Sequence, residues 1–330
     1  MSAPDGILGV VTQGTGGVWR VRADDGTMHD ASLRGRLKKT DTGRRAGGSI
    51  RRDTVEAARE RLKLAVGDRV RLERDERGHA LAIAEILPRH SRLARRAPGG
   101  GYGERVLAAN VDQVVIVFAA AKPDPHPRML DRFLVIAEAN GLPARVVVNK
   151  VDLVEPEVAH ARFTDYPRAG YPVHFTSTKR GDGLEVLRRA LAGRTSVLTG
   201  PSGTGKSSLI NALFPGLELR VGAISESVNK GRHTTVGASL HPLPGDEGGF
   251  VVDTPGLREV GMWELPVERL DLCFPEIRAH REQCRFADCR HGAEPDCEVR
   301  AAVERGEVSV ERYESYVKIL DERESEVVKW

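Results

Sequence analysis

The first ninety residues alternate between short apolar runs and turn residues. Glycine and aspartate separate the runs, as at 14–17, 24–26 and 67–68, and these residues favour turns. Four runs have the length and alternation of strands: 7–12, 18–22, 69–73 and 80–87. Short strands at this spacing predict a small β-barrel. Residues 33–64 are polar and basic, so we expect a long loop there with a helical turn near 55–64.

The pattern changes after a Pro- and Gly-rich stretch at 98–103, which we interpret as a linker. Longer, continuous apolar runs follow, at 111–120, 144–149, 173–176, 196–199 and 249–253. Helical patterns lie between several of them, at 129–140, 183–192 and 207–214. Strands buried on both faces and alternating with helices predict a mostly parallel α/β sheet.

From residue 266 onward the chain is polar and helical in pattern, and it ends in a charged helix near 309–328. A chain of 330 residues has room for two or three domains. We therefore expect a multidomain protein divided at 1–97, 98–265 and 266–330.

Composition narrows the class of protein. The chain is 40% hydrophobic and 29% charged, as folded proteins are. No run of about 18 apolar residues predicts a membrane span, and the first residues lack a secretion signal, so the expected location is the cytoplasm.

Charge is unevenly distributed, although the net charge is only +3. Residues 34–63 hold eleven Lys or Arg against four Asp or Glu. Such a block favours contact with a polyanion such as RNA, and a solvated loop is the alternative.

A phosphate-binding loop follows the predicted strand 196–199. The pattern G-x-x-x-x-G-K-[ST] is matched at every fixed position, and a helical pattern follows it. Its residues, with the serine after them, are Gly200, Pro201, Ser202, Gly203, Thr204, Gly205, Lys206, Ser207 and Ser208. Backbone N–H groups of such a loop surround phosphate oxygens at a helix N-terminus. Lys206 would reach the β and γ phosphates, and Ser207 would bind Mg²⁺.

A second motif indicates which base is bound. The sequence N-K-x-D ends the apolar run at 144–149, and it consists of Asn149, Lys150, Val151 and Asp152. The Asp152 carboxylate would accept hydrogen bonds from the ring N–H and amine of guanine, which adenine lacks, so the motif favours GTP. Thr176, Ser177 and Thr178 form a supporting motif after the next run.

The γ-phosphate sensors of a GTPase are predicted in the last third of the sheet region. Asp253 and Gly256 fit D-x-x-G, whose loop responds to loss of the γ-phosphate. Either Thr234 or Thr235 would complete the Mg²⁺ shell with Ser207, and we choose Thr235. Leu257 occupies the place where many GTPases carry a glutamine that orients water. His233 is therefore the candidate for that role, together with Lys206 and Thr235, and an exposed loop histidine is the alternative.

The motifs run in an unusual order. The guanine motifs come first, and the phosphate loop, the switch threonine and D-x-x-G follow. This order is a circular permutation of the usual GTPase arrangement, so D-x-x-G leads directly into the C-terminal segment.

The C-terminal segment holds a Cys/His cluster. Cys284, Cys289, His291 and Cys297 provide three thiolates and one imidazole, which suit a closed, structural Zn²⁺ site. Cys273 lies upstream and is interpreted as core. Nearby arginines would form a basic surface suited to RNA phosphate: Arg278, Arg281, Arg285 and Arg290.

Permuted motifs, a predicted barrel and a Cys/His cluster together resemble the RsgA family, ribosome small subunit-dependent GTPases. The resemblance implies an N-terminal OB-fold barrel, a central circularly permuted P-loop GTPase domain and a C-terminal, mostly helical zinc domain. It also implies GTP hydrolysis that assists late maturation of the small ribosomal subunit, stimulated by that subunit and accompanied by rRNA binding.

Three alternatives remain open at this point. One is a permuted GTPase that acts on the large subunit, the second is a P-loop enzyme that uses ATP, and the third is a binding module with a vestigial nucleotide site. No pattern indicates an oligomer, so a monomer is expected.

Overall fold

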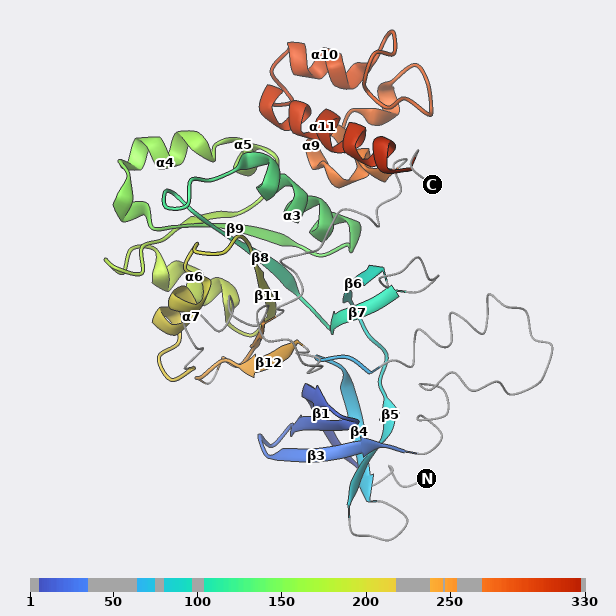
Figure 1. Ribbon diagram of the computed structural model, residues 1–330, viewed down its shortest axis with the longest axis vertical. Coiled ribbons are helices and arrows are strands. Elements are labelled where there is room, and N and C mark those ends of the chain that lie inside the picture. The colour runs from blue at the N-terminus through green and yellow to red at the C-terminus, as the bar shows by residue number, and fades with distance from the viewer. Residues whose placement is uncertain are drawn as a thin grey trace, which may run out of the picture.

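A computed structural model describes residues 6–34, 64–74, 80–96, 104–217, 238–245, 247–253 and 269–327. Figure 1 shows three units along the long axis, with a barrel at the bottom, a sheet flanked by helices in the middle and a helical unit at the top. Most of the basic block lies outside the described ranges. Within those ranges, no helix is long and apolar enough to cross a membrane.

The N-terminal unit is a closed barrel with strand order β1-β2-β3-β5-β4. Its strands are β1 (Ile7–Thr15), β2 (Val18–Ala23), β3 (Met28–Leu33), β4 (Arg69–Arg74) and β5 (Leu81–Ile86). β3 pairs with β5 in parallel, and the other neighbours are antiparallel. Val11, Val21, Leu72 and Ile83 fill the interior and are fully shielded from solvent. The predicted barrel is confirmed.

One strand of the barrel escaped prediction. β3 reads Met-His-Asp-Ala-Ser-Leu, and its inward positions are Ala31 and Leu33. A small alanine and one leucine among polar residues give little apolar alternation. The strand forms because both of its neighbours, β2 and β5, offer open hydrogen-bonding edges.

A hairpin of β6 (Arg92–Arg96) and β7 (Glu104–Ala109) connects the barrel to the sheet. It flanks the Gly-rich stretch 98–103, which lies outside the described ranges. Leu93 and Ala108 from the two strands are buried in the same apolar cluster as the sheet. The hairpin is therefore packed onto the central unit.

The central sheet has six strands in the order β10-β9-β8-β11-β13-β12. They are β8 (Gln113–Ala119), β9 (Ala144–Asn149), β10 (Val173–Phe175), β11 (Thr195–Thr199), β12 (Ser239–Pro242) and β13 (Phe250–Asp253). All neighbours are parallel except β12, which runs antiparallel to β13. The predicted α/β sheet is confirmed, and β12 is an additional edge strand.

Helices cover both faces of this sheet (Figure 1). They are α3 (Pro127–Ala139), α4 (Pro156–Arg162), α5 (Asp165–Arg168), α6 (Leu184–Leu191) and α7 (Lys206–Leu213). Alternate residues of β8 face opposite sides: Ile116 and Phe118 pack with α3, whereas Val115 and Val117 pack with α6 and α7. Because both faces are buried, the strands read as continuous apolar runs.

The C-terminal unit is mostly helical, as predicted. It comprises η4 (Asp271–Cys273), α9 (Pro275–Arg278), η5 (Arg281–Gln283), α10 (Glu298–Glu304) and α11 (Val310–Val327). Val135 on the outer side of α3 joins its apolar cluster, which includes Phe274 and Ile319. The helix α3 thus packs against the sheet on one side and the C-terminal unit on the other.

Candidate functional site

The phosphate-binding pattern forms the turn between β11 and α7, as the sequence predicted. Gly205 ends this turn with φ +89°, a left-handed conformation that favours glycine. Lys206 and Ser207 open the helix and are buried. Lys206 Nζ donates to the carbonyls of Gly200 (2.7 Å) and Pro201 (2.6 Å), so the ammonium group lies over the loop.

The guanine motif lies against this loop, although the contacting residues Asn149 and Thr204 are 55 positions apart in sequence. The fully buried Asn149 donates from Nδ2 to the carbonyl of Thr204 at 3.0 Å. A Cβ at Gly205 would come within 2.6 Å of that nitrogen, so glycine is required there for space as well as for its φ. Lys150 Nζ donates to the carbonyl of Gly203 at 2.6 Å. The permuted motifs therefore meet at one site.

The supporting motif completes the base side of the site. Thr176 Oγ1 donates to Asn149 Oδ1 at 3.2 Å, and Ser177 Oγ donates to Asp152 Oδ1 at 2.7 Å. The hydrogen bond from Ser177 holds the pKa of the Asp152 carboxyl below its usual value. Asp152 is therefore ionised at neutral pH and can only accept hydrogen bonds, as a partner of guanine must.

Removal of the Ser177 hydroxyl tests this support. Ser177→Ala is expected to weaken GDP affinity about 10- to 150-fold, because the ionised Asp152 loses a hydrogen bond to a charged group, worth about 1.5–3 kcal/mol. Calorimetric titration measures the affinity. In an Asp152→Ala background the same serine substitution should have almost no effect, and equal effects in both backgrounds would contradict the assigned role.

Some of the remaining predicted site residues lie within the described part of the chain, and others lie outside it. Val151 begins the short turn η1 (Val151–Leu153), Thr178 follows Ser177, and the exposed Ser202 lies in the loop. Asp253 ends β13, directly across from Leu198 on β11, so it lies at the same sheet edge as the phosphate loop. Four predicted site residues lie outside the described ranges: His233, Thr234, Thr235 and Gly256.

One segment that borders the loop was not predicted from the sequence. The backbone carbonyl of Lys122, after β8, accepts from Lys150 Nζ at 2.5 Å. Pro123 would lie 3.6 Å from a Cβ at Gly203. The group that accepts from Lys150 is the backbone carbonyl of Lys122, which any residue type would provide, so the sequence does not signal this contact.

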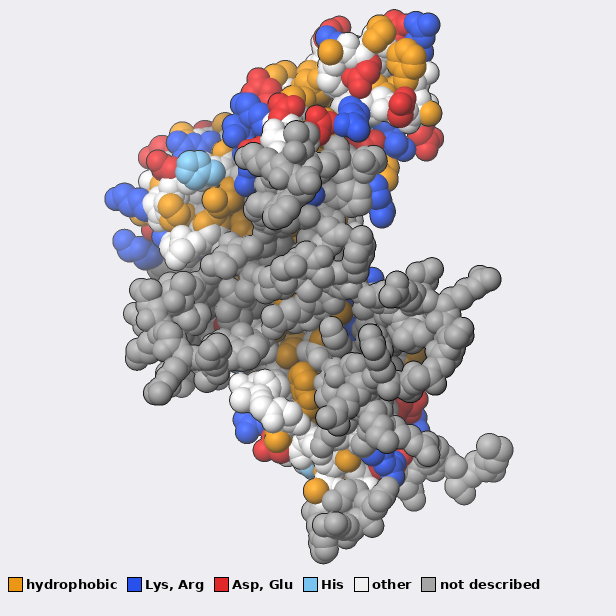
Figure 2. All heavy atoms as spheres, turned by 45° about the vertical axis from the view of Figure 1, so that its right-hand side comes forward, with side chains coloured by type: hydrophobic (Ala, Val, Ile, Leu, Met, Phe, Trp, Pro, Cys, Tyr) orange, Lys and Arg blue, Asp and Glu red, His pale blue; other side chains and the backbone are white. Residues whose placement is uncertain are grey.

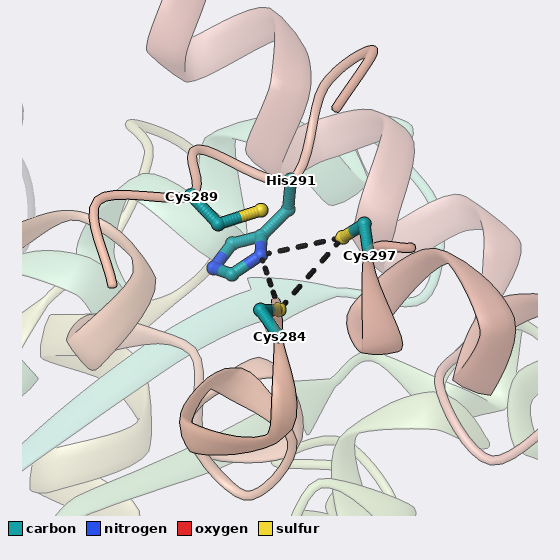
Figure 3. A group of neighbouring side chains, drawn as sticks. All are labelled: Cys284, Cys289, His291 and Cys297. Atoms are coloured by element: carbon teal, nitrogen blue, oxygen red, sulfur yellow. Dashed lines mark hydrogen bonds between the residues drawn. The ribbon is translucent and has the colours of Figure 1, made fainter. Parts of the chain in front are cut away.

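The four predicted metal ligands converge in the C-terminal unit (Figure 3). Their ligand atoms all lie within 4.8 Å of one another. His291 Nδ1 is 3.5 Å from Cys284 Sγ and 3.5 Å from Cys297 Sγ, and the two sulfurs are 4.0 Å apart. Tetrahedral zinc ligands at usual bond lengths lie about 3.8 Å apart for two sulfurs and about 3.6 Å for sulfur and nitrogen. The donor set and spacing therefore fit a Zn²⁺ ion.

The arginines of the predicted basic surface near these ligands are already paired with carboxylates. Each of its four arginines faces a carboxylate: Arg278 with Glu138, Arg281 with Asp271, Arg285 with Asp296 and Arg290 with Glu324. Figure 2 shows blue and red side chains interspersed over the top of the molecule. Phosphate binding there would compete with these ion pairs.

Comparison with known proteins yields one consistent set of relatives. The family model described as RsgA GTPase matches residues 86–263. A protein of Gemmatimonas aurantiaca named Small ribosomal subunit biogenesis GTPase RsgA is 60% identical over 315 residues, covering 95% of this chain and 96% of its own. A Bacteroides fragilis protein of the same name is 35% identical, with 96% and 97% of the two chains covered.

Two solved structures share the whole fold. YjeQ from Thermotoga maritima aligns with a TM-score of 0.75 and 34% identity, covering 96% of this chain and 98% of its own. YloQ, described as a circularly permuted GTPase, aligns with a TM-score of 0.70 and 27% identity, covering 98% and 96%. Both alignments span the barrel, the sheet and the helical unit.

Proposed function

The chain belongs to the RsgA GTPase family and is a GTP-hydrolysing enzyme, and from that premise we propose that it assists maturation of the small ribosomal subunit. The observation that best supports a working GTP site is the contact between Asn149 Nδ2 and the carbonyl of Thr204, which joins the guanine motif to the phosphate loop. The names of its relatives supply the subunit. We propose cytoplasmic action as a monomer, with division into domains at 1–97, 98–265 and 266–330.

Co-sedimentation with separated ribosomal subunits tests this proposal. In the presence of a non-hydrolysable GTP analogue, the chain should pellet with small subunits and should leave them with GDP. Small subunits should also stimulate GTP hydrolysis, whereas large subunits should not. Stimulation by large subunits alone, or equal competition by ATP, would favour one of the alternatives instead.

The proposed GTP site uses both halves of the permuted chain. Asp152 reads guanine, Asn149 and Thr176 position the base motif, and the loop 200–207 surrounds the phosphates. Lys206 neutralises charge on the β and γ phosphates. Mg²⁺, when bound, would shield the phosphate oxygens, and Ser207 and Thr235 are the residues proposed to hold it. Asp253 and Gly256 would sense the γ-phosphate.

Hydrolysis is proposed to depend on His233, because Leu257 cannot orient water. His233→Ala should lower single-turnover GTP hydrolysis about 100-fold with small subunits present, the low end of general-base effects. Affinity for GDP should stay unchanged. A rate equal to that of the unaltered chain would remove His233 from the mechanism.

We also propose a single structural Zn²⁺ at Cys284, Cys289, His291 and Cys297. Four protein ligands leave no open position for water, so the metal would stabilise the C-terminal unit and take no part in hydrolysis. Elemental analysis of the purified chain should find about one zinc per chain.

A further inference from the structure

One nitrogen of His291 is left without a hydrogen bond. Nδ1 faces the sulfurs of Cys284 and Cys297, and Figure 3 shows the other ring nitrogen on the far side of the imidazole. That atom, Nε2, is buried and has no hydrogen-bond partner among the described residues. A buried N–H without a partner costs about 1–3 kcal/mol, so an acceptor nearby matters for the site.

The nearest charged acceptor belongs to Asp271. Its Oδ2 lies 3.7 Å from His291 Nε2, and the two side chains are only 8% and 1% exposed. Asp271 is outside the ligand segment, on η4, the first described turn after D-x-x-G. No sequence pattern connects it with the four ligands.

Asp271 is itself held in place. Its Oδ1 accepts the backbone N–H of Leu272 at 2.9 Å, and its Oδ2 accepts from Arg281 Nε at 2.5 Å. The guanidinium group of Arg281 offsets the negative charge of the Asp271 carboxylate, which lies in a nearly buried position beside His291. The backbone of His291 is fixed as well, since its carbonyl accepts from Tyr313 Oη at 2.6 Å.

We propose that Asp271 is the positioning residue of this metal centre: it accepts the Nε2–H of His291, fixing the tautomer in which Nδ1 is free to bind. Metal-binding histidines generally donate their second ring N–H to such an acceptor, and loss of it weakens metal affinity 10- to 100-fold. The inference rests on the proposed zinc. A carboxylate that served only to pair with Arg281 would not affect the metal more than Arg281 does.

Metal competition separates these two roles. Zinc is withdrawn from the purified full-length chain by graded amounts of a chromogenic chelator, and the apparent zinc affinity is compared among variants. Asp271→Ala should lower it about 10- to 100-fold. Asp271→Asn, which preserves volume and removes charge, should lower it at least about fivefold. Asp296→Asn is the matched control, an exposed carboxylate next to Cys297 that pairs with Arg285, and it should have no effect.

A second readout follows the ligand field directly. In the Co²⁺-substituted chain, Asp271→Asn should shift the visible absorption bands of the metal, whereas Asp296→Asn should not. Wild-type affinity and spectrum in the Asp271 variants would overturn the inference, and so would an equal loss of affinity in Arg281→Ala. Absence of zinc from the unaltered chain would instead refute the zinc proposal itself. If Asp271→Ala does not fold, Asp271→Asn decides between these outcomes.

Discussion

Arg312→Ala is expected to lower the free energy of unfolding by about 3–5 kcal/mol, the usual cost of breaking a buried ion pair. The Arg312 side chain is only 3% exposed. It donates from Nη1 to Asp131 on α3 and from Nε to Glu276 on α9, the latter at 2.6 Å. Its guanidinium also lies over the ring of Phe274, 4.7 Å from the centroid. Alanine would leave two carboxylates buried without a counter-charge.

Urea-induced unfolding measures this loss, and Arg305→Ala is the matched control. Arg305 pairs with Glu298 and Glu307, yet its side chain is 45% exposed, so its removal should cost under about 1 kcal/mol. Combining Arg312→Met with Asp131→Asn and Glu276→Gln should recover part of the stability, because no buried charge then remains unpaired. Equal losses for Arg312→Ala and Arg305→Ala would contradict the assignment.

Asp152→Asn is expected to lower GTP affinity about 1,000-fold and to create affinity for xanthosine triphosphate. Guanine presents two donors to the carboxylate, and an asparagine would set its own N–H₂ against one of them. A site built for a hydrogen bond rejects the wrong partner by several orders of magnitude. Xanthine has a carbonyl where guanine has its amine, so it would accept from the asparagine.

Equilibrium binding of GTP and of xanthosine triphosphate measures this change of base specificity. Ser177 would still donate to the side-chain oxygen at position 152, so the orientation of the residue is retained. Asp182→Asn is the control, since Asp182 is an exposed carboxylate nearby that pairs with Arg180. A loss of GTP affinity without any gain for xanthosine triphosphate would show that Asp152 only supports the fold.

Motifs made of close neighbours in sequence were the predictable part of the molecule. The phosphate loop and N-K-x-D each follow a strand, and parallel strands end at one edge of a sheet. Their contact through Asn149 and Thr204 therefore follows from the α/β pattern. The strand at Ala144–Asn149 has the predicted bounds because its apolar run is continuous.

Contacts between distant segments were not predictable in the same way. Asp131 and Arg312 each look like ordinary charged positions on a helix, and only packing of α11 against α3 buries them together. Asp271 is a similar case, because only the tertiary packing of η4 brings its carboxylate close to His291. The edge strand β12 has only Leu240 as a buried apolar residue, too little for a periodic signal.

The pairing of Asp131 with Arg312 also determines how late in synthesis the fold can be completed. The two residues are 181 positions apart, so the acid on α3 is synthesised long before its counter-ion. A nascent chain that has folded its central sheet still carries an apolar helix surface around Val135 and an unsatisfied carboxylate beside it. That surface stays exposed until the C-terminal unit, in which both η4 and α11 contact α3, has been synthesised and has packed onto it. The central unit of a nascent chain therefore remains open to nonspecific apolar contacts until the C-terminal unit arrives.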